Sequence, residues 1–286
     1  MFVPRKILEE KLLQLLAEDV GQGDVTTAAI MKEGQIIEAS IIAKESGVAA
    51  GIEEVVILAE GLGLKTETCV KDGEALKKGQ IVVKFSGDAR TILSAERTML
   101  NLLSRMSGIA TATKRLVEKL REARMATKVA ATRKSAPGLL YFDKKAVLLG
   151  GGDPHRLHLD DMILIKDNHV AVVGSVEAAV KKAKLNASFT KKVEVEVTRI
   201  ADAVVAAKAG ADIVMLDNFS PKQIIEAKAS LKKAGFFGKV ILEASGGITE
   251  ANLLEYAATG VNVLSLGELT HSAKALDLSL EIKRIC

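Results

Sequence analysis

The sequence predicts an α/β fold in which parallel strands alternate with helices, following a β-rich region over residues 1–110. Three observations support this prediction. Short apolar segments recur between residues 128 and 266, helical patterns separate most of them, and the segments are apolar on both faces. Strands that alternate with helices at this spacing are typical of parallel sheets with right-handed crossovers. Segments that are apolar on both faces indicate a sheet that helices cover on both sides.

The region over residues 1–110 is predicted to be a mixed α/β domain. An amphipathic helix over 6–17 opens it, and a glycine-containing break and a turn at 24–27 follow. A helix over 52–60 interrupts the β-rich stretches, and a helical stretch over 91–123 leads into the alternating part. The β-rich stretches lie at 35–43, 64–70 and 80–86.

The alternating part contains six predicted strands with helices between most of them. The strands lie at 128–131, 162–165, 193–197, 213–216, 240–242 and 261–266, and the helices at 176–185, 199–209, 221–234 and 251–258. Six strands fit either a barrel with fewer than eight strands or an open, doubly wound sheet. A barrel gathers all its carboxyl-terminal strand ends on one face, whereas an open sheet gathers only those at its switch point.

Polar residues or glycines occur at the end of every predicted strand, and this favours the barrel. We therefore predict a catalytic barrel domain over 111–274 and an N-terminal domain over 1–110 that a strand at 275–286 completes. The strand ends carry Thr132-Arg133-Lys134-Ser135, Lys166-Asp167-Asn168-His169, Glu194 and Glu196, Asp217-Asn218, Glu243-Ala244-Ser245-Gly246-Gly247, and Gly267-Glu268.

Composition narrows the class of protein. Hydrophobic residues make up 48% and charged residues 27% of the 286, as in a folded globular protein. A net charge of +4 with seven phenylalanines, two tyrosines and no tryptophan argues against nucleic-acid binding. We recognise no signal peptide and no apolar run near the roughly 20 residues of a membrane helix. Cys69 and Cys286 belong to no Cys/His cluster, so we predict neither a disulfide nor a zinc site and expect a cytoplasmic protein.

Two glutamates in one predicted strand are unusual. Residues two apart in a strand share a face, so Glu194 and Glu196 point opposite to the valines of that strand and into the barrel. Burying a carboxylate there costs several kcal/mol unless a cation compensates. Either a lysine partner forms a structural ion pair, or the carboxylates bind a metal or face a transition state, joined by Asp217 on the next strand.

A glycine-containing turn near the end of the barrel predicts a phosphate site. Ser245, Gly246 and Gly247 precede a predicted helix, and glycines let backbone N–H groups approach an anion. The last strands of a barrel are a common phosphate position. Gly267, after the following strand, fits the same role.

Cationic side chains gather at or near the strand ends. Arginine binds carboxylates and phosphates bidentately, and lysine serves as a point charge. Chemistry alone therefore indicates a metal-assisted transfer that involves a phosphorylated substrate. A Schiff-base aldolase using Lys134 or Lys166, a non-catalytic polyanion-binding protein, and a capping role for His155 remain alternatives. The cationic residues are Arg133, Lys134, His155, Arg156 and Lys166.

Taken in order and spacing, these motifs resemble the quinolinate phosphoribosyltransferase family over nearly the whole chain. Single motifs are weak signals, but their combination is specific. A sister group linked to molybdenum transport shares much of this barrel, and the run over 165–169 argues against that group. The resemblance is carried by residues 23–27, 96–101, 132–138, 150–152 with 155–156, 164–169, 193–197, 216–218, 245–248 and 267–271.

The resemblance implies an α/β protein with an incomplete (β/α) barrel of about six to seven parallel strands and a mixed α/β N-terminal domain, paired as a homodimer. It implies transfer of phosphoribosyl from phosphoribosyl pyrophosphate to quinolinate with decarboxylation. The products would be nicotinate mononucleotide, pyrophosphate and CO2, in de novo NAD biosynthesis. Mg2+ is the implied cofactor.

The resemblance also implies a role for each site residue. Arg133, His155 and Arg156 would hold the quinolinate carboxylates, with Arg97 entering from the other subunit. Lys134 and Lys166 would meet substrate anions and pyrophosphate, and Glu196 and Asp217 would serve the ribose and Mg2+; these four form the expected catalytic set. Ser245, Gly246, Gly247, Gly267 and His271 complete the expected substrate-binding set, with the 5′-phosphate beside Ser245, Gly246 and Gly267.

Two positions differ from what the family usually has. Leu140 stands where arginine is usual and Lys145 where tyrosine is common. The difference at Leu140 removes one expected anion contact, and whether Lys144 or Lys145 replaces it stays open at this point.

Overall fold

The structure is a computed structural model that describes residues 3–285. The chain forms two compact units, each with its own sheet. The first unit comprises the chain up to Lys114, the segment Tyr141–Gly151 and the chain from Ala273 onward. The second comprises Arg115–Leu140 and Gly152–Ser272. The chain therefore leaves the first unit twice and returns to it twice.

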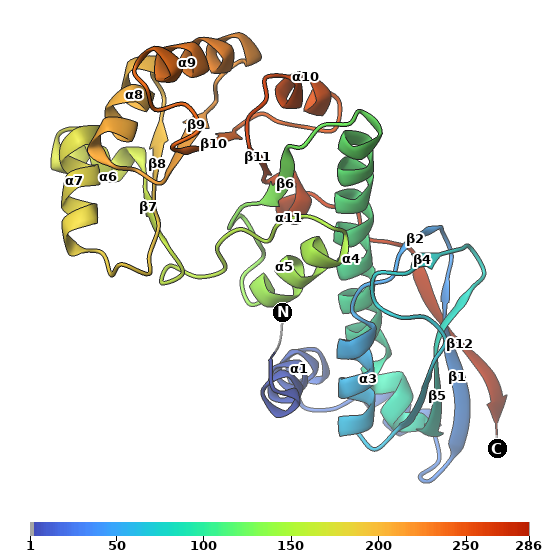
Figure 1. Cartoon of the computed structure of the whole chain (residues 1–286). Helices are drawn as coiled ribbons and strands as arrows, with labels where there is room; N and C mark the ends of the chain where they lie inside the picture. Colours follow the sequence, from blue (N-terminus) through green and yellow to red (C-terminus); the bar gives the residue numbers. More distant parts are fainter. Residues whose placement is uncertain (1–2, 286) are drawn as a thin grey trace. The chain divides into compact units, whose positions relative to one another are not determined.

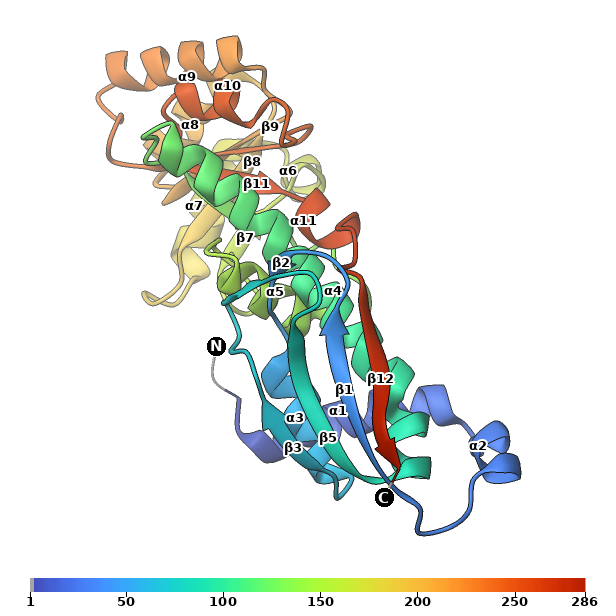
Figure 2. The same cartoon turned by 90° about the vertical axis from the view of Figure 1, so that its right-hand side faces the viewer.

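A four-stranded antiparallel sheet forms one layer of the first unit. Its strand order is β12-β1-β5-β3, and Figure 2 shows these strands side by side. β1 pairs with β5 on one side and with β12, from the end of the chain, on the other. The strands are β1 (Ile36–Ala43), β3 (Lys65–Thr68), β5 (Ile81–Asp88) and β12 (Leu278–Ile285), and the short strands β2 (Gly47–Val48) and β4 (Ala75–Leu76) form a separate pair.

Helices cover the sheet of the first unit. α3 (Ile52–Gly61) packs on β3 and β5, and α1 (Arg5–Val20) packs on α3. In α1 the buried residues Leu8, Leu12 and Leu16 are four apart and so share one helix face. The long helix α4 (Ala89–Glu122) follows β5.

The predicted turn at 24–27 is wrong, because a short helix forms there. α2 runs from Val25 to Ile30, and the Asp24 side chain accepts a hydrogen bond from the Thr27 backbone N–H. Asp24 is therefore an N-cap, which satisfies one of the backbone donors left open at a helix start.

Helix α5 (Leu140–Leu149) carries three buried charged residues. Arg105 binds Asp143 through two hydrogen bonds of 2.7 and 2.8 Å. The Lys145 Nζ donates to Glu54 at 2.7 Å and also to Glu53, and it lies 3.8 Å from Asp72. Burial alone lowers the pKa of Lys145, but the surrounding carboxylates outweigh burial and raise it. Within the first unit, these ion pairs hold α5 in place.

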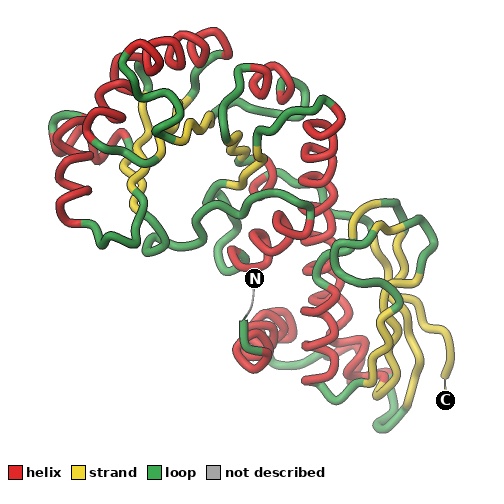
Figure 3. The backbone as a smooth tube through the Cα atoms, viewed as in Figure 1, coloured by secondary structure: helices red, strands yellow, loops and turns green. Residues whose placement is uncertain are grey.

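The second unit contains a parallel six-stranded sheet. Its order is β6-β11-β10-β9-β8-β7, and every pair within it is parallel. Helices lie outside the strands (Figures 1 and 3). The strands are β6 (Lys128–Ala131), β7 (Ile163–Ile165), β8 (Val193–Val197), β9 (Ile213–Asp217), β10 (Ile241–Ser245) and β11 (Val263–Leu266). The helices are α6 (Asp167–Val173), α7 (Val176–Asn186), α8 (Ile200–Ala209), α9 (Pro221–Lys233), α10 (Leu253–Ala258) and α11 (Glu268–His271).

This sheet is the predicted incomplete barrel. β6 and β7 are its end strands, and among the described residues they do not pair with each other. On its free edge, β6 forms a single parallel bridge, between Ala130 and Asp153. The segment at Asp153 therefore lies where a further strand would pair with β6. Each predicted parallel strand is present, although β10 extends to Ser245, so that Glu243 lies inside the strand and not after it.

Two further findings concern the chain as a whole. Across residues 3–285, no helix combines the length and the apolar character needed to cross a membrane. Cys69 is free and exposed, and Cys286 lies outside the described residues.

Candidate active site

A pocket of about 550 Å³ lies at the carboxyl-terminal ends of the barrel strands. Its lining comes from all six strands of the second unit or from the segments that follow them. Residues far apart in the sequence meet there because parallel strands end at one face of a barrel. The lining residues are Ala131, Thr132, Arg133, Lys134, His155, Arg156, Leu164, Lys166, Glu196, Met215, Asp217, Asn218, Glu243, Ser245, Gly246, Gly247 and Ser265.

Most of the predicted site residues line this pocket. They are Arg133, Lys134, His155, Arg156, Lys166, Glu196, Asp217, Ser245, Gly246 and Gly247. Gly267 and His271 are not among the lining residues. Gly267 lies between the side chains of Lys134 and His271: a Cβ on it would be 3.2 Å from Lys134 Cδ and 3.0 Å from His271 Nε2. Arg97 belongs to the first unit, where it is exposed on α4.

The two glutamates of β8 have different surroundings. Glu196 is half-buried, and its Oε1 lies 3.2 Å from Lys166 Nζ. Glu196 therefore has the lysine partner that the ion-pair alternative requires. Both residues of this pair line the pocket. Glu194 is fully buried.

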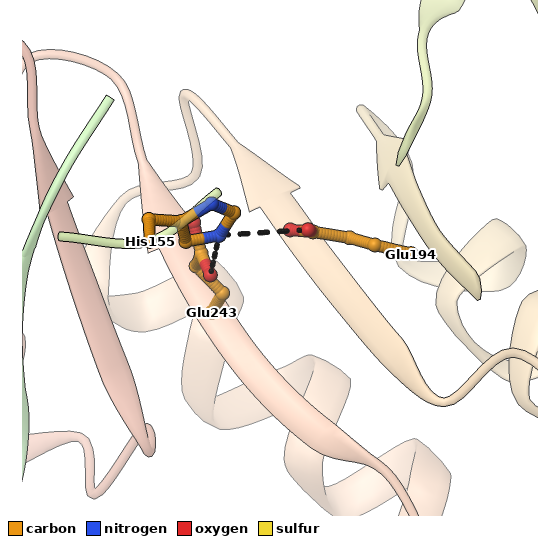
Figure 4. Close-up of side chains that lie close together, drawn as sticks. All are labelled: His155, Glu194 and Glu243. Atoms are coloured by element: carbon orange, nitrogen blue, oxygen red, sulfur yellow. Dashed lines mark hydrogen bonds and ion pairs between the residues drawn. The ribbon is translucent and has the colours of Figure 1, made fainter. Parts of the chain in front are cut away.

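Beneath the pocket, Glu194 belongs to a cluster with His155 and Glu243 (Figure 4). His155 Nε2 lies 3.2 Å from Glu243 Oε2 and 3.5 Å from Glu194 Oε2. The Ser265 hydroxyl donates to the other oxygen of Glu243. Burial, and then the nearby Glu243, raise the pKa of Glu194 to about 8. These contacts fix the imidazole of His155 from below the pocket.

The backbone at His155 is in the left-handed region, with φ of 54°. The Asp153 carboxylate accepts a hydrogen bond of 2.8 Å from the His155 backbone N–H, which supports this conformation. The strained turn places Arg156 next to the pocket as well. Burial, and then the neighbouring Arg133 guanidinium, hold the pKa of Arg156 below its usual range. Two guanidinium groups that repel each other in one pocket are suited to share an anion between them.

The glycine turn after β10, which the sequence predicts to bind a phosphate, lines the pocket. Gly246 and Gly247 have φ of 90° and 65°, a region that glycine adopts without strain. The following helix α10 begins only at Leu253, later than predicted, so the turn and not a helix terminus follows β10 at the pocket. On the neighbouring strand end, the Thr270 hydroxyl donates to the Lys134 backbone carbonyl at 2.6 Å.

Several lining residues had no predicted role, among them Asn218, Glu243 and Ser265. Asn218 follows Asp217 directly, and its place in the same motif was the available signal. Glu243 and Ser265 lie on adjacent strands, β10 and β11, and both are buried. For each of them, the available signal was a polar residue inside an otherwise apolar strand. The strand was predicted to end at 242, so Glu243 was placed after the strand and this signal was missed.

The structure answers the question about Lys144 and Lys145. Both are buried in the first unit, and Lys145 is bound by Glu54 and Glu53. Neither is among the residues that line the pocket of the second unit, and Leu140 is not among them either.

At the strand ends of this incomplete barrel, arginines, lysines, carboxylates and a Gly-Gly turn meet in one pocket, as expected of a barrel enzyme that acts on an anionic substrate. The chain matches the family model for the quinolinate phosphoribosyl transferase C-terminal domain over residues 109–281 and that for the N-terminal domain over 24–107. The chain belongs to the quinolinate phosphoribosyl transferase family.

Individual relatives agree over nearly the full length. The chain is 48% identical over 270 residues to the probable carboxylating nicotinate-nucleotide pyrophosphorylase of Methanothermobacter thermautotrophicus, covering 94% of this chain and 97% of that protein. It is 40% identical over 255 residues to the carboxylating human nicotinate-nucleotide pyrophosphorylase, covering 89% of this chain and 85% of that one. The crystal structure of NadC from Streptococcus pyogenes matches with a TM-score of 0.88 at 38% identity, covering 99% of this chain and 100% of that one.

Proposed function

We infer that this chain is a carboxylating phosphoribosyltransferase of NAD biosynthesis. It transfers phosphoribosyl from phosphoribosyl pyrophosphate to quinolinate and gives nicotinate mononucleotide, pyrophosphate and CO2. The family membership and the names of the relatives support this activity. The observation that carries it is one pocket that unites cations for anionic substrates with carboxylates for a developing positive charge.

The cations of the pocket fit a substrate with two carboxylates. Arg133 and Arg156 offer planar guanidinium groups, which bind carboxylates through paired hydrogen bonds. His155, fixed by Glu243 from below, is proposed to contact the same substrate. These three residues are the proposed quinolinate site.

The carboxylates fit the other partner of the reaction. Departure of pyrophosphate leaves positive charge at the ribose carbon, which Glu196 and Asp217 are proposed to stabilise. Lys134 and Lys166 are proposed to meet the negative charge of pyrophosphate and of the other substrate anions. Ser245, Gly246 and Gly267 are proposed to hold the 5′-phosphate, and Gly247 and His271 complete the proposed substrate-binding set.

Mg2+ is proposed as the cofactor. The donor set fits, because Mg2+ prefers oxygen ligands and usually binds one or two carboxylates together with substrate phosphates. Glu196 and Asp217, on the adjacent strands β8 and β9, are the residues that would hold it. When bound, the ion would neutralise charge on the pyrophosphate oxygens.

The activity itself is directly testable. With carboxyl-labelled quinolinate, phosphoribosyl pyrophosphate and Mg2+, the purified protein is expected to release labelled CO2 and to form nicotinate mononucleotide in equal amounts. Nicotinate in place of quinolinate is the control, because it lacks the second carboxylate that the paired arginines bind. Absence of release from quinolinate, by a protein shown to be folded, would refute the proposed function.

We also propose that the enzyme is a cytoplasmic homodimer and that Arg97 enters the partner's pocket. Arg97 is exposed on α4, and no hydrogen bond or ion pair found among residues 3–285 involves it. A second copy would bring its own Arg97, since a two-fold interface is reciprocal.

Mixing two inactive variants tests the shared site. Arg97→Ala and Asp217→Ala are each expected to be nearly inactive alone. In a mixed dimer one barrel keeps its own Asp217 and receives an intact Arg97, while the other lacks both. Random mixing gives about half mixed dimers with one intact site each, so activity should return to about a quarter of wild type.

The assay follows mild dissociation, mixing in equal amounts and reassociation of the purified variants. Each variant mixed with itself is the control for the treatment. If mixtures stay at the level of the single variants, Arg97 does not enter the partner's site.

A further inference from the structure

The turn that follows β9 places one side chain between two parts of the proposed site. Asn218 has φ of 56°, in the left-handed region that asparagine tolerates better than most residues. Its backbone N–H donates to the Ser245 carbonyl at 2.8 Å, which joins the ends of β9 and β10. Its side-chain Nδ2 donates to Asp217 Oδ2 at 2.8 Å.

The other side of the Asn218 amide is packed against Gly246. A Cβ on Gly246 would lie 2.2 Å from Asn218 Oδ1, 2.6 Å from its Cγ and 3.0 Å from its backbone nitrogen. No real Cβ contact is that short, so the residue at 246 must be glycine as long as the amide is in place. The Asn218 amide thus fills the space between the Asp217 carboxylate and the glycine turn.

The turn is also anchored from behind. Phe219, the next residue, is 2% exposed, and Ser220 then caps α9 by accepting from the Gln223 backbone N–H. The main chain of Asn218 is thus held on both sides, which fixes the position from which its side chain starts. Asn218 is exposed and lines the pocket together with Asp217, so the contact between them lies in the pocket wall.

We propose that Asn218 is a positioning residue for the reaction: it orients the Asp217 carboxylate and sets the spacing between that carboxylate and the Ser245–Gly247 turn. This proposal rests on the proposed function, in which the two groups serve the ribose carbon and the 5′-phosphate of one substrate. The Asn218 amide then sets the distance between the protein group that faces the ribose carbon and the turn that faces the 5′-phosphate. Small misplacements matter, because an error of about 1 Å can cost 10²-fold in rate.

The first test asks whether Asn218 acts through Asp217. Asn218→Gly keeps the left-handed backbone and removes the amide. We expect kcat to fall by about 10- to 100-fold, as for other residues that orient a reacting group, with the KM for quinolinate and the unfolding midpoint little changed. In an Asp217→Asn background the same change should cost less than about 3-fold, because the carboxylate that it orients is already gone.

The second test asks whether Asn218 sets the spacing to the glycine turn. Gly246→Ala should weaken the binding of phosphoribosyl pyrophosphate, measured by calorimetry, because the new Cβ displaces the amide. In an Asn218→Gly background the same methyl group meets only backbone, so its further effect on binding should be smaller than in the wild-type background.

The outcomes distinguish failure of the positioning role of Asn218 from failure of the proposed function on which it rests. Wild-type activity of Asp217→Asn would overturn the role of Asp217 and with it the reason for orienting it. A disabled Asp217→Asn beside a fully active Asn218→Gly would overturn the positioning role alone. Losses in kcat that multiply in the double variant would show that Asn218 acts independently of Asp217, which also overturns the proposal.

Discussion

Replacing Asp217 by asparagine is expected to lower kcat by about 10²–10³ without unfolding the protein. The change removes a charge that the proposed reaction needs at the ribose carbon or for Mg2+. It keeps the size of the side chain, and the new amide oxygen can still accept from Asn218, as Asp217 Oδ2 does at 2.8 Å. Asp217 forms no ion pair found among residues 3–285, so no buried cation is left unpaired.

A matched control exists on the same segment of chain. Asp212 directly precedes β9, at the end of the strand opposite to Asp217, and its carboxylate lies 3.1 Å from Lys184 Nζ. Asp212→Asn removes the same charge far along the strand from the pocket and should leave kcat near wild type. Steady-state rates and thermal unfolding are measured for both variants. If Asp217→Asn simply unfolds, Asp217 has a structural role and the proposed catalytic role fails.

Replacing Lys145 by methionine is expected to destabilise the first unit by about 3–5 kcal/mol, as when one partner of a buried ion pair is removed. Methionine keeps the volume of the lysine stem, so the loss reports the charge. Glu54 is fully buried, and one of its oxygens already lacks a hydrogen bond. Burial raises the pKa of Glu54 even with Lys145 present, so without the ammonium group its charge is uncompensated.

The measurement is unfolding by denaturant, followed by circular dichroism. Lys181→Met is the matched control, because Lys181 pairs with Glu177 at 2.6 Å on the exposed surface of α7, where such pairs contribute about 0.5 kcal/mol or less. Adding Glu54→Gln to Lys145→Met should restore part of the stability, since no charge then stays buried. Equal effects of Lys145→Met and Lys181→Met would contradict the assignment of Lys145 as a buried anchor.

Much of the fold and the pocket could be predicted because both depend on patterns that are local in sequence. The apolar segments of the barrel strands are short and regular, and the polar residues that follow them must meet at one face. The alternation in β8 likewise predicted that Glu194 and Glu196 share the inward face. These inferences required only the period of a strand and the parallel direction of its neighbours.

Other features could not be predicted because they depend on partners distant in sequence. Asp143, Lys144 and Lys145 form a charged run that is typical of a solvent-exposed helix, yet all three are buried. The carboxylates that accept from Lys145 lie 91 and 92 residues away in the sequence. Similarly, the contacts of Glu243 with His155 and Ser265 could not be predicted, because these two residues come from other segments of the chain.

The pairing of β1 with β12 has a consequence for how the protein is made. Ile41, in β1, lies opposite Leu280, in β12, so the sheet of the first unit joins an early segment of the chain to a late one. During synthesis on the ribosome, this hydrogen-bonding edge of β1 stays unpaired until β12 has emerged, after the barrel strands. An unpaired strand edge is a template for wrong pairing between nascent chains. Completion of this sheet therefore follows the synthesis of all six barrel strands.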